Sequence, residues 1–564
     1  MFTRHFAHWP PNASKSLAVP ATTLCYNLDV SATRYPDKSA IVYYGRHISF
    51  AHLRQQVEAL AGYLSAVCKV GPGDRVILNC QNSPQFVIGY YAILRANAVV
   101  VPANAMLKQE ELRYLAEDSG AQTALFGQEI LSEWLPLLND GALAHAVVAT
   151  YGDYLPASEA RLVDALPDVV IAPRSPLPGA PAPASLIGWQ DALDAGHAPP
   201  RQVATADDLA VLPYTSGTTG APKGCMHTHR TVMSTAVFQQ AWSGRTGEAV
   251  ALATLPMFHV TGMQANMNLP ILAGNTVVIM TRWDRDAAAQ LIQACRVTTF
   301  TGITAMMVDF LGNPRLGEYD LSSLTYLSGG GAAMPDAVAR ALQERIGLPF
   351  IEGYGLTETI APTHVNPSHR PKRQCAGIPI FHTDARVIDV DTRVEKGPGE
   401  TGEIVVNGPQ VFKGYWKRPD ATTEAFIEID GKSFFRTGDL GHYDEEGYFF
   451  ITDRLKRMIN ASGFKVWPAE VEAMLYDHPA VSEACVIARR DPHRGETVKA
   501  IIVLKPQAAG NTRPQDIIDW AAGRMAAYKA PKIVEFANAL PKTGTGKVFW
   551  RKLQEIENAT QGNA

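Results

Sequence analysis

The chain of 564 residues is too long for one hydrophobic core and predicts several domains. Its composition, 46% hydrophobic and 19% charged, is that of a globular protein, and a net charge of −4 gives no electrostatic reason to expect a nucleic-acid partner. The seven scattered cysteines contain no Cys-x-x-Cys pair, which argues against a zinc or disulfide framework and favours reduced thiols in a cytoplasmic compartment.

The N-terminal stretch MFTRHFAHWPPNASKS lacks the apolar run of a signal peptide. The most membrane-like run, FVIGYYAIL (86–94), is nine residues long, whereas about twenty are needed to cross a bilayer. The sequence therefore predicts no transmembrane segment and leaves peripheral membrane contact open. It does not decide between a monomer and a homodimer.

From about residue 40 to 355, short β-branched runs alternate with helical stretches such as 50–67. This alternation predicts an α/β fold of doubly wound parallel sheets covered by helices, with ligands at the carboxyl ends of the strands. The runs read as strands are 74–80, 121–127, 210–217, 276–280 and 324–331.

The proline- and alanine-rich segment 152–205 is expected to be an exposed excursion rather than packed structure. Short strands separated by turn signals predict a β-rich subdomain at about 376–450. A helix–strand–strand–helix pattern follows residue 457 and predicts a small α+β domain. We therefore expect an N-terminal domain over 1–453, a hinge at 454–457 and a mobile C-terminal domain over 458–564.

The stretch YTSGTTGAPKG, residues 214–224, combines hydroxyls, glycines and one lysine after an apolar strand. Such a loop can surround phosphate with backbone N–H groups, hydroxyls and a mobile charge. Its lysine, Lys223, follows a proline and precedes a glycine, so the spacing is not that of a Walker A loop. On these residues alone, a solvated turn is an equal alternative.

The loop resembles the signature of the adenylate-forming superfamily, which includes acyl-CoA synthetases, adenylation domains and firefly luciferase. Further family motifs follow in order: EGYGLTE (352–358), TGD (437–439), DRLKRMINASGFKV (453–466) and PKTGTGK (541–547). The resemblance covers about residues 25 to 555. It implies a large N-terminal domain hinged to a small C-terminal one, with an acid, ATP, Mg²⁺ and coenzyme A (CoA) as the small-molecule partners.

The resemblance implies that the loop at 214–224 holds the β- and γ-phosphates of ATP. It also implies a role for residues of the other motifs. Thr215 and Glu358 would bind Mg²⁺, which prefers oxygen ligands, Tyr354 would stack on adenine, and Thr357 would contact the α-phosphate. Asp439 would accept hydrogen bonds from the ribose, with Arg454 in support. The other residues implied in nucleotide binding are Ser216, Gly217, Thr218, Thr219, Gly330, Gly331, Glu352 and Gly353.

The resemblance also implies that one protein runs two reactions by rotating its C-terminal domain about Lys456. Lys547 would enter the site for adenylation, with its ammonium between the carboxylate and the α-phosphate. After rotation, Gly463 would line the tunnel for the pantetheine of CoA. Asn460 stands where luciferases carry a lysine, so luciferase-type oxidation loses support.

LPMFHVTGMQANM (255–267) resembles the acyl-pocket motif of the family. His259 stands where amino-acid-activating domains carry an aspartate, and a neutral imidazole cannot pair an α-ammonium group. Val260 and Met263 are the other residues expected to contact the acid, in apolar surroundings that suit an alkyl chain. A medium- or long-chain fatty acid is therefore the first expectation, and an aryl or branched acid the second, because Asn266 and Asn268 admit one.

The sequence favours an ATP-dependent acid:CoA ligase that releases AMP and pyrophosphate. An acyl-AMP ligase that loads a carrier protein is the alternative within the same class. A P-loop kinase or ATPase is disfavoured by the missing Walker spacing, and a catalytically silent nucleotide-binding protein by the intact Lys547, Glu358 and Asp439.

Overall fold

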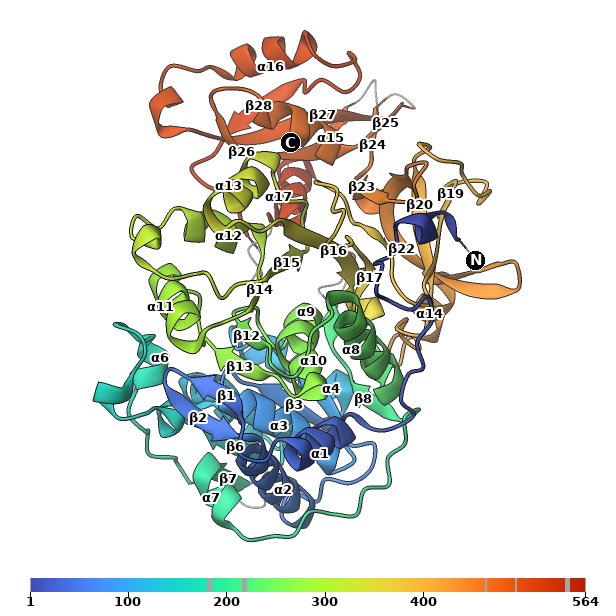
Figure 1. The fold of residues 1–564 in the computed structure, drawn as a ribbon. Helices are drawn as coiled ribbons and strands as arrows, with labels where there is room; N and C mark the ends of the chain where they lie inside the picture. The colour runs from blue at the N-terminus through green and yellow to red at the C-terminus, as the bar shows by residue number, and fades with distance from the viewer. Residues whose placement is uncertain are drawn as a thin grey trace.

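The computed structural model describes residues 2–179, 185–215, 221–461, 464–491, 495–542 and 548–562. Two large sheets with helices between and around them form the lower part of the molecule in Figure 1, a β-rich lobe lies beside them, and a smaller α+β part lies above. The α/β fold with a large N-terminal part and a smaller C-terminal part, expected from the sequence, is confirmed.

The first large sheet is parallel through its centre and antiparallel at both edges. In spatial order its strands are β18 (Ile378–Pro379), β17 (Ala361–Val365), β16 (Phe350–Leu356), β15 (Tyr326–Gly330), β14 (Thr299–Thr301), β12 (Val250–Ala253), β13 (Thr276–Ile279), β1 (Ser39–Tyr43) and β2 (Arg46–Ser49).

The second large sheet is parallel except at β11, and a two-stranded ladder of β9 (Tyr214–Thr215) and β10 (Lys223–Gly224) stands apart from it. In order, the strands of this sheet are β11 (His227–Thr228), β8 (Leu209–Val211), β4 (Val99–Pro102), β3 (Arg75–Asn79), β5 (Thr123–Gly127), β6 (His145–Ala149) and β7 (Ser185–Gly188).

Alternating side chains of the second sheet pack into two different cores. Val76 and Leu78 of β3 point into the core shared with the first sheet, whereas Ile77 points to the opposite face, as the two-residue period of a strand requires. Being apolar on both faces, these strands read as continuous apolar runs in the sequence. The strands expected at 74–80, 121–127, 276–280 and 324–331 are confirmed within a few residues.

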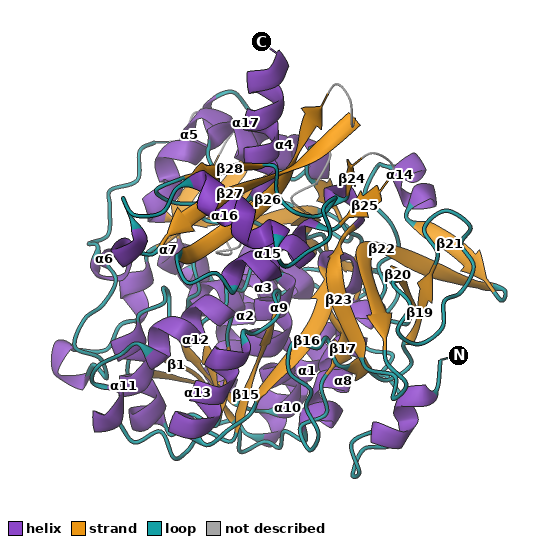
Figure 2. Cartoon of the chain, turned by 90° about the horizontal axis from the view of Figure 1, so that it is seen from above, coloured by secondary structure: helices purple, strands orange, loops and turns teal. Residues whose placement is uncertain are grey.

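Helices cover both faces of the sheets, as the alternating pattern predicts (Figure 2). Several begin at a side chain that accepts a backbone N–H, such as Ser49, Ser83 and Asp284. The helices of this part are α1 (Leu24–Arg34), α2 (Phe50–Ala66), α3 (Pro84–Arg95), α4 (Gln109–Ser119), α5 (Leu131–Asn139), α6 (Asp168–Ile171), α7 (Trp189–Asp194), α8 (His229–Ser243), α9 (Val260–Met263), α10 (Leu269–Ala273), α11 (Arg285–Cys295), α12 (Thr304–Leu311) and α13 (Asp336–Ile346).

Among the described residues, short 3-10 helices and one π-helical turn occur along the whole chain. They are η1 (Arg4–His8), η2 (Gln128–Ile130), η3 (Tyr151–Tyr154), η4 (Ser158–Ala160), the π-helical η5 (Gln264–Asn268), η6 (Leu316–Glu318), η7 (Thr357–Thr359), η8 (Leu455–Arg457) and η9 (Pro506–Ala508).

Two expectations for this part were wrong in detail. The segment 152–205 is not wholly exposed, because β7 pairs with β6 and the Trp189 side chain is buried in the main core. The run 210–217 is not one strand either, because β8 ends before Pro213, which has no N–H to donate, and β9 pairs with β10 instead. In both cases tertiary pairing overrides the local composition.

The β-rich lobe predicted at 376–450 is present as an antiparallel sheet. Its elements are β19 (Asp384–Ile388), β20 (Gly402–Asn407), α14 (Pro419–Glu424), β21 (Phe426–Ile429), β22 (Lys432–Tyr443) and β23 (Phe449–Arg454).

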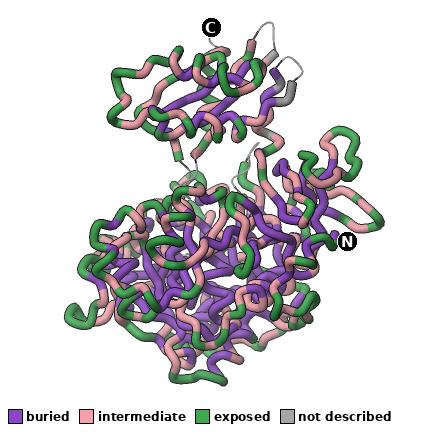
Figure 3. Tube along the Cα trace, turned by 45° about the horizontal axis from the view of Figure 1, so that its top comes forward, coloured by how far each residue is buried: buried purple, intermediate pink, exposed green. Residues whose placement is uncertain are grey.

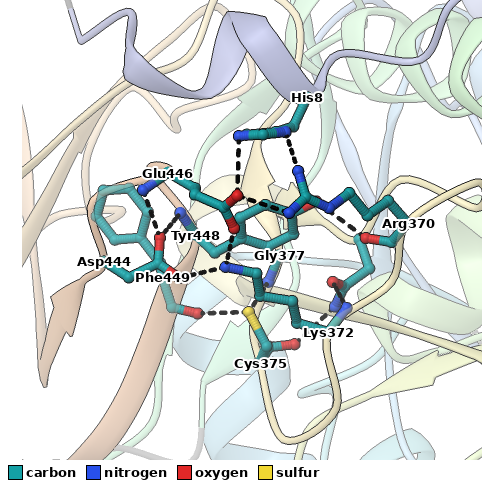
Figure 4. A network of polar contacts seen from close by, with 10 residues as sticks. His8, Arg370, Lys372, Cys375, Gly377, Asp444, Glu446, Tyr448 and Phe449 are labelled. Atoms are coloured by element: carbon teal, nitrogen blue, oxygen red, sulfur yellow. Dashed lines mark hydrogen bonds and ion pairs between the residues drawn. The ribbon is translucent and has the colours of Figure 1, made fainter.

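A charged network holds the N-terminal segment against this lobe (Figure 4). Arg370 donates hydrogen bonds to His8 and to the Glu446 carboxylate, each at 2.6 Å. Lys372 pairs with both Asp444 and Glu446 in the turn between β22 and β23. These bonds, mainly the one from Lys372, lower the pKa of Glu446 to about 2.

The C-terminal part has a hydrophobic core of its own, which includes Ile459, Val486, Ile502 and Ile517 (Figure 3). The expected helix–strand–strand–helix pattern is present, and a hairpin, a further strand and a last helix add to it. Its elements are β24 (Ile459–Ala461), β25 (Phe464–Val466), α15 (Pro468–Tyr476), β26 (Val481–Asp491), β27 (Gly495–Leu504), α16 (Pro514–Ala522), β28 (Ile533–Phe536) and α17 (Trp550–Gly562).

Candidate active site

The two ends of the expected phosphate loop are joined by the β9–β10 ladder, in which Thr215 is the register partner of Lys223. Both residues are partly exposed. The pairing fixes where the loop begins and ends, and it brings the predicted hydroxyl ligand and the predicted phosphate-binding lysine to adjacent strands. The loop residues between them that were predicted to bind phosphate, Ser216, Gly217, Thr218 and Thr219, lie outside the described residues.

Helix α4 and the segment 413–418 hold this ladder from outside. The Tyr114 hydroxyl donates to the Pro222 carbonyl at 2.7 Å. The Asp118 carboxylate, nearly inaccessible to solvent, accepts from the Tyr214 hydroxyl and from the Arg418 guanidinium, both at 2.7 Å. Residues up to 300 positions apart in the chain therefore clamp the stem of the loop.

Glu358 lies in η7, directly after β16, and faces the same segment. Its Oε1 accepts a hydrogen bond from the Tyr415 hydroxyl at 2.8 Å, and its carbonyl accepts from the Phe412 N–H at 2.8 Å. Burial raises the pKa of Glu358. The neighbouring Thr357 is partly exposed, and its carbonyl oxygen is 2.8 Å from Nε2 of His227.

The turn that follows Glu358 carries unusual backbone geometry. Ile360 and Ala361 both have positive φ values, 45° and 86°, in the region that non-glycine residues rarely enter. Strain of this kind persists where surrounding packing over-determines the conformation, and it clusters at functional sites. Here it turns the chain sharply from η7 into β17.

Tyr354, Asp439 and Arg454 form a chain of contacts across three strands. The Tyr354 hydroxyl donates to Oδ2 of Asp439 at 2.6 Å, and Nε of Arg454 lies 2.8 Å from Oδ1. Asp439 is 2% exposed, whereas the Arg454 side chain is 47% exposed. The Asp439 carboxylate raises the pKa of Arg454, and burial raises that of Tyr354, so the phenol keeps its proton. These three residues, predicted to bind the nucleoside, meet in one place.

The glycines after β15 permit a close approach between neighbouring strands. A Cβ at Gly330 would lie 2.3 Å from the carbonyl oxygen of Gly353 on β16, a distance that no side chain tolerates. Gly331 has a φ of +87°, a conformation that favours glycine. Its own exposure leaves the backbone accessible at this edge of the sheet.

Glu352 stands behind these glycines rather than in the open site. Its buried carboxylate accepts backbone N–H bonds from Met334 at 2.9 Å and from Gln374 at 2.8 Å. Burial raises its pKa, although both bonds act in the opposite direction. Glu352 therefore anchors the loop after β15, and direct contact with a nucleotide stays a prediction.

His259 is the N-cap of α9, where its Nδ1 accepts from the Thr261 N–H at 3.4 Å. Val260 and Met263 on the same helix are buried in the main core. The π-helical η5 follows directly, a feature that often marks functional sites. The sequence pattern did not reveal it.

The buried amide of Asn268, in η5, is committed to protein partners. Its Nδ2 donates to the Tyr90 hydroxyl at 3.2 Å, and its Oδ1 accepts from the Tyr91 hydroxyl at 3.1 Å. Asn266, also buried, donates weakly to the Leu255 carbonyl at 3.5 Å. Asn268 is therefore not a free polar group for a substrate.

The C-terminal side of the site is described only in part. Lys456 lies in η8, but its side chain is outside the described residues, as are Gly463 and Lys547 in full. The adjacent Asp453 carboxylate accepts a hydrogen bond from the Ala469 N–H at the start of α15, at 2.6 Å. Asp453 thus connects the end of β23 to the first helix of the C-terminal part.

In the described ranges, no group of three or more His, Cys, Asp or Glu side chains could hold a metal ion. Mg²⁺ fits this site nonetheless, because it commonly binds through one or two carboxylates together with substrate phosphates. Glu358 offers an oxygen ligand beside the phosphate-loop stem. Thr215 offers a hydroxyl on the stem itself.

Sequence reasoning missed Asp118, Tyr114 and Tyr415 as parts of this site. The stretch KGYWKR (413–418), with aromatic and basic residues side by side, was the signal that could have drawn attention to the last of these. Asp118 and Tyr114 lie on an ordinary amphipathic helix and gave no such signal.

A search of the described residues for a helix with the length and apolar character of a membrane span found none.

Known proteins and protein-family models match this chain over most of its length. A family model described as AMP-binding enzyme matches residues 28–416, and one described as AMP-binding enzyme C-terminal domain matches residues 470–547. The chain is 35% identical over 562 residues to a long-chain-fatty-acid–CoA ligase of Bacillus subtilis (strain 168), covering 98% of this chain and 97% of that one.

It is also 35% identical over 516 residues to a feruloyl-CoA synthase of Amycolatopsis sp, covering 91% of this chain and 95% of that one. Among solved structures, ATP-bound MatB from Rhodopseudomonas palustris superposes with a TM-score of 0.81 at 27% identity. That match covers 95% of this chain and 99% of the other.

Proposed function

The chain belongs to the AMP-binding enzyme family, in its acyl-CoA synthetase branch, and from this premise we propose that it activates a medium- or long-chain fatty acid. As an AMP-forming acyl-CoA synthetase it uses ATP and CoA as substrates. A carboxylate is a poor electrophile, so its oxygen first attacks the α-phosphorus of ATP and expels pyrophosphate. The CoA thiol then attacks the acyl-adenylate carbonyl, loses its proton and displaces AMP.

The first step concentrates negative charge on the phosphates, and this chain supplies cations and donors where that charge develops. The 215–223 loop holds the β- and γ-phosphates, with Lys223 as its charge and Thr357 at the α-phosphate. Lys547 bridges the attacking carboxylate and the α-phosphate. The paired positions of Thr215 and Lys223 support this assignment, because both sit on the stem that frames the loop.

The nucleoside lies against Tyr354, Gly330, Gly331 and Gly353, with Asp439 at the ribose. Each oxygen of the Asp439 carboxylate already has one partner, but carboxylate oxygens carry further lone pairs for ribose hydroxyls. Arg454 supports the same carboxylate from the hinge side. Holding the acceptor rigidly lowers the entropy lost when the nucleotide binds.

Glu358 and Thr215 are the residues that would hold Mg²⁺. When bound, that ion neutralises part of the phosphate charge and helps pyrophosphate to leave. The support for Glu358 is its position beside the loop stem and its fixed Oε1.

The second step requires the acyl-adenylate to become open to CoA. We assign the change to rotation of the C-terminal domain, residues 458–564, about the hinge at 454–457 with Lys456 as the pivot. Rotation withdraws Lys547 and brings Gly463 to the pantetheine path. Arg457 of this hinge contacts the moving part, because it donates hydrogen bonds to the Glu472 carboxylate at 3.3 Å and to the Val486 carbonyl at 3.2 Å.

One observation carries the choice of an alkyl acid: Val260 and Met263, on the helix that His259 caps, are apolar and buried, while the Asn268 amide is bonded to two tyrosines. A polar acid would have to break those bonds. The similarity to a long-chain-fatty-acid–CoA ligase over 98% of the chain agrees with this choice. The similarity to a feruloyl-CoA synthase makes an aryl acid the second candidate.

Acid-dependent exchange of pyrophosphate into ATP, across a panel of fatty, aryl and amino acids, tests the proposal. We expect exchange with C8 to C18 fatty acids and at least tenfold less with ferulate or benzoate, because a long alkyl chain buries more apolar surface than either ring does. Preference for an aryl acid would overturn the fatty-acid assignment. Adding free CoA or a carrier protein after acyl-adenylate formation then identifies the acceptor.

A further inference from the structure

Tyr415 stands between the two groups assigned above to the metal and to the phosphates. Its hydroxyl donates to Oε1 of Glu358 at 2.8 Å. Its ring lies beneath the Lys223 ammonium, 5.0 Å from Nζ to the ring centroid. A single side chain therefore contacts both groups, with its polar end on one and its π-face on the other.

The backbone around Tyr415 leaves its side chain little freedom. The Trp416 N–H donates to the Gly224 carbonyl at 2.8 Å, next to Lys223, and the Tyr415 N–H donates to Oγ1 of Thr422 at 2.9 Å. The ring packs edge-on against Phe412 at 4.8 Å. Tyr415 is thus built into a rigid segment paired with the loop stem.

In this contact the Tyr415 hydroxyl is the donor and the Glu358 carboxylate is the acceptor. A neutral phenol beside a carboxylate donates a hydrogen bond, keeps its proton and leaves the carboxylate negative. The Tyr415 hydroxyl fixes Oε1 of Glu358 and thereby orients Oε2.

We propose that Tyr415 is a positioning residue for adenylation: its hydroxyl holds Glu358 in place for the metal, and its ring holds Lys223 in place for the phosphates. The inference rests on the function proposed above and adds a residue to it. Residues that hydrogen-bond to a metal ligand orient that ligand, and their substitution lowers the affinity for the metal. The two halves of the side chain are predicted to have separable effects.

Binding of ATP to the full-length protein, measured by titration calorimetry with Mg²⁺ and again with EDTA, separates the two roles. Tyr415→Phe keeps the ring and removes the hydroxyl. We expect about tenfold weaker binding of ATP with Mg²⁺ and unchanged binding in EDTA. Tyr415→Leu removes the ring as well and is expected to weaken binding in EDTA too, about threefold.

Tyr154→Phe is the matched control. Tyr154 lies in η3, outside the site, and the substitution removes a hydroxyl that donates to Gln56 at 3.2 Å. It is expected to bind ATP like the parent protein in both conditions. If Tyr415→Phe behaved like this control, the positioning role would be overturned. Because Tyr415→Phe keeps the ring and its packing, it decides the question even if Tyr415→Leu fails to fold.

Pyrophosphate exchange with a fatty acid distinguishes this inference from the proposed function. Tyr415→Phe should need about tenfold more Mg²⁺ for half-maximal exchange, with an unchanged KM for the acid, and Mn²⁺ should restore part of the loss. A parent protein that exchanges with no fatty acid would reject the substrate proposal but leave the calorimetric test of Tyr415 standing. Normal exchange in the parent with an unshifted Mg²⁺ requirement in Tyr415→Phe would reject the positioning role alone.

Discussion

Two buried aspartates on adjacent strands of the β-rich lobe show how the nucleotide side and the hinge side of the site differ. Asp439 on β22 is paired with Tyr354 on β16 and with Arg454 at the end of β23. Asp453 on β23 instead accepts the Ala469 N–H at the start of α15, in the C-terminal part. We propose that these two side chains of one type serve different purposes: Asp439 prepares the nucleotide site, and Asp453 links the two parts of the chain.

The contrast extends to the surrounding bonds. Around the phosphate-loop stem, the Asp118 carboxylate accepts hydrogen bonds from Tyr214 and from Arg418, and these bonds fix the stem without a ligand. On the C-terminal side, Asp453 lies 3.8 Å from Arg457, and Arg457 donates hydrogen bonds to Glu472 and to the Val486 carbonyl in the C-terminal part. We infer that hydrogen bonds within the N-terminal part hold the proposed nucleotide side in place, whereas the proposed rotation has to rearrange the contact of Asp453 with α15.

The largest expected effect is a loss of the adenylation half-reaction alone, on substitution of Lys547. Lys547→Ala should lower the rate of fatty-acid-dependent pyrophosphate exchange about a thousandfold, because it removes the cation from the developing charge. Transfer from chemically prepared acyl-adenylate to CoA should stay within a few-fold of the parent rate. Equal losses in both half-reactions would show that Lys547 is not confined to adenylation.

Asp439→Asn is expected to have the next largest effect. It removes the charge that pairs with Arg454 and weakens acceptance of ribose hydroxyls, so the KM for ATP should rise ten- to a hundredfold. The KM for the acid should not change. Asp207→Asn is a suitable control, because its exposed ion pair with Arg230 lies on the surface; a similar KM for ATP in both variants would contradict the role of Asp439.

Asp453→Ala should act on stability rather than on ATP affinity. The Ala469 N–H loses its acceptor at the beginning of α15, and we expect a loss of about 1–3 kcal/mol in the free energy of unfolding, concentrated in the C-terminal part. Differential scanning calorimetry and hydrogen exchange of α15 measure it. Uniform destabilisation of both parts, or an effect on ATP binding as large as that of Asp439→Asn, would remove the distinction between the two aspartates.

The smallest expected effect concerns the network of His8, Arg370, Lys372 and Glu446. The pKa of Glu446 falls from its ordinary 4.5 to about 2 in the folded protein, so its contribution to stability is present above pH 4.5 and is lost as the pH falls toward 2. Glu446→Gln should therefore flatten the decline in Tm between about pH 4.5 and 2. If the Tm of the parent and that of the variant fell by the same amount over this pH range, the network would not depress the pKa of Glu446.

Local patterns were sufficient for much of the fold. The strands at 74–80 and 276–280 are buried on both faces and therefore stand out as apolar runs, and the helix at 50–67 begins at a capping serine. The segment 185–194 was misread because prolines and alanines on its N-terminal side dominate the composition. Trp189 is buried against distant residues, and no local period records that.

For the site, the sequence by itself determined which residue types are present and in what order, because the motif from Tyr214 to Gly224 and those ending at Glu358 and Asp439 are contiguous. Only the tertiary structure decided which of them touch. Arg418 reaches Asp118 across 300 positions, and Tyr415 reaches Glu358 across 57. Hydrogen bonds depend on distance in space. The backbone bond from the Trp416 N–H to the Gly224 carbonyl holds the segment 413–418 beside the loop stem, and a one-dimensional pattern carries no measure of that proximity.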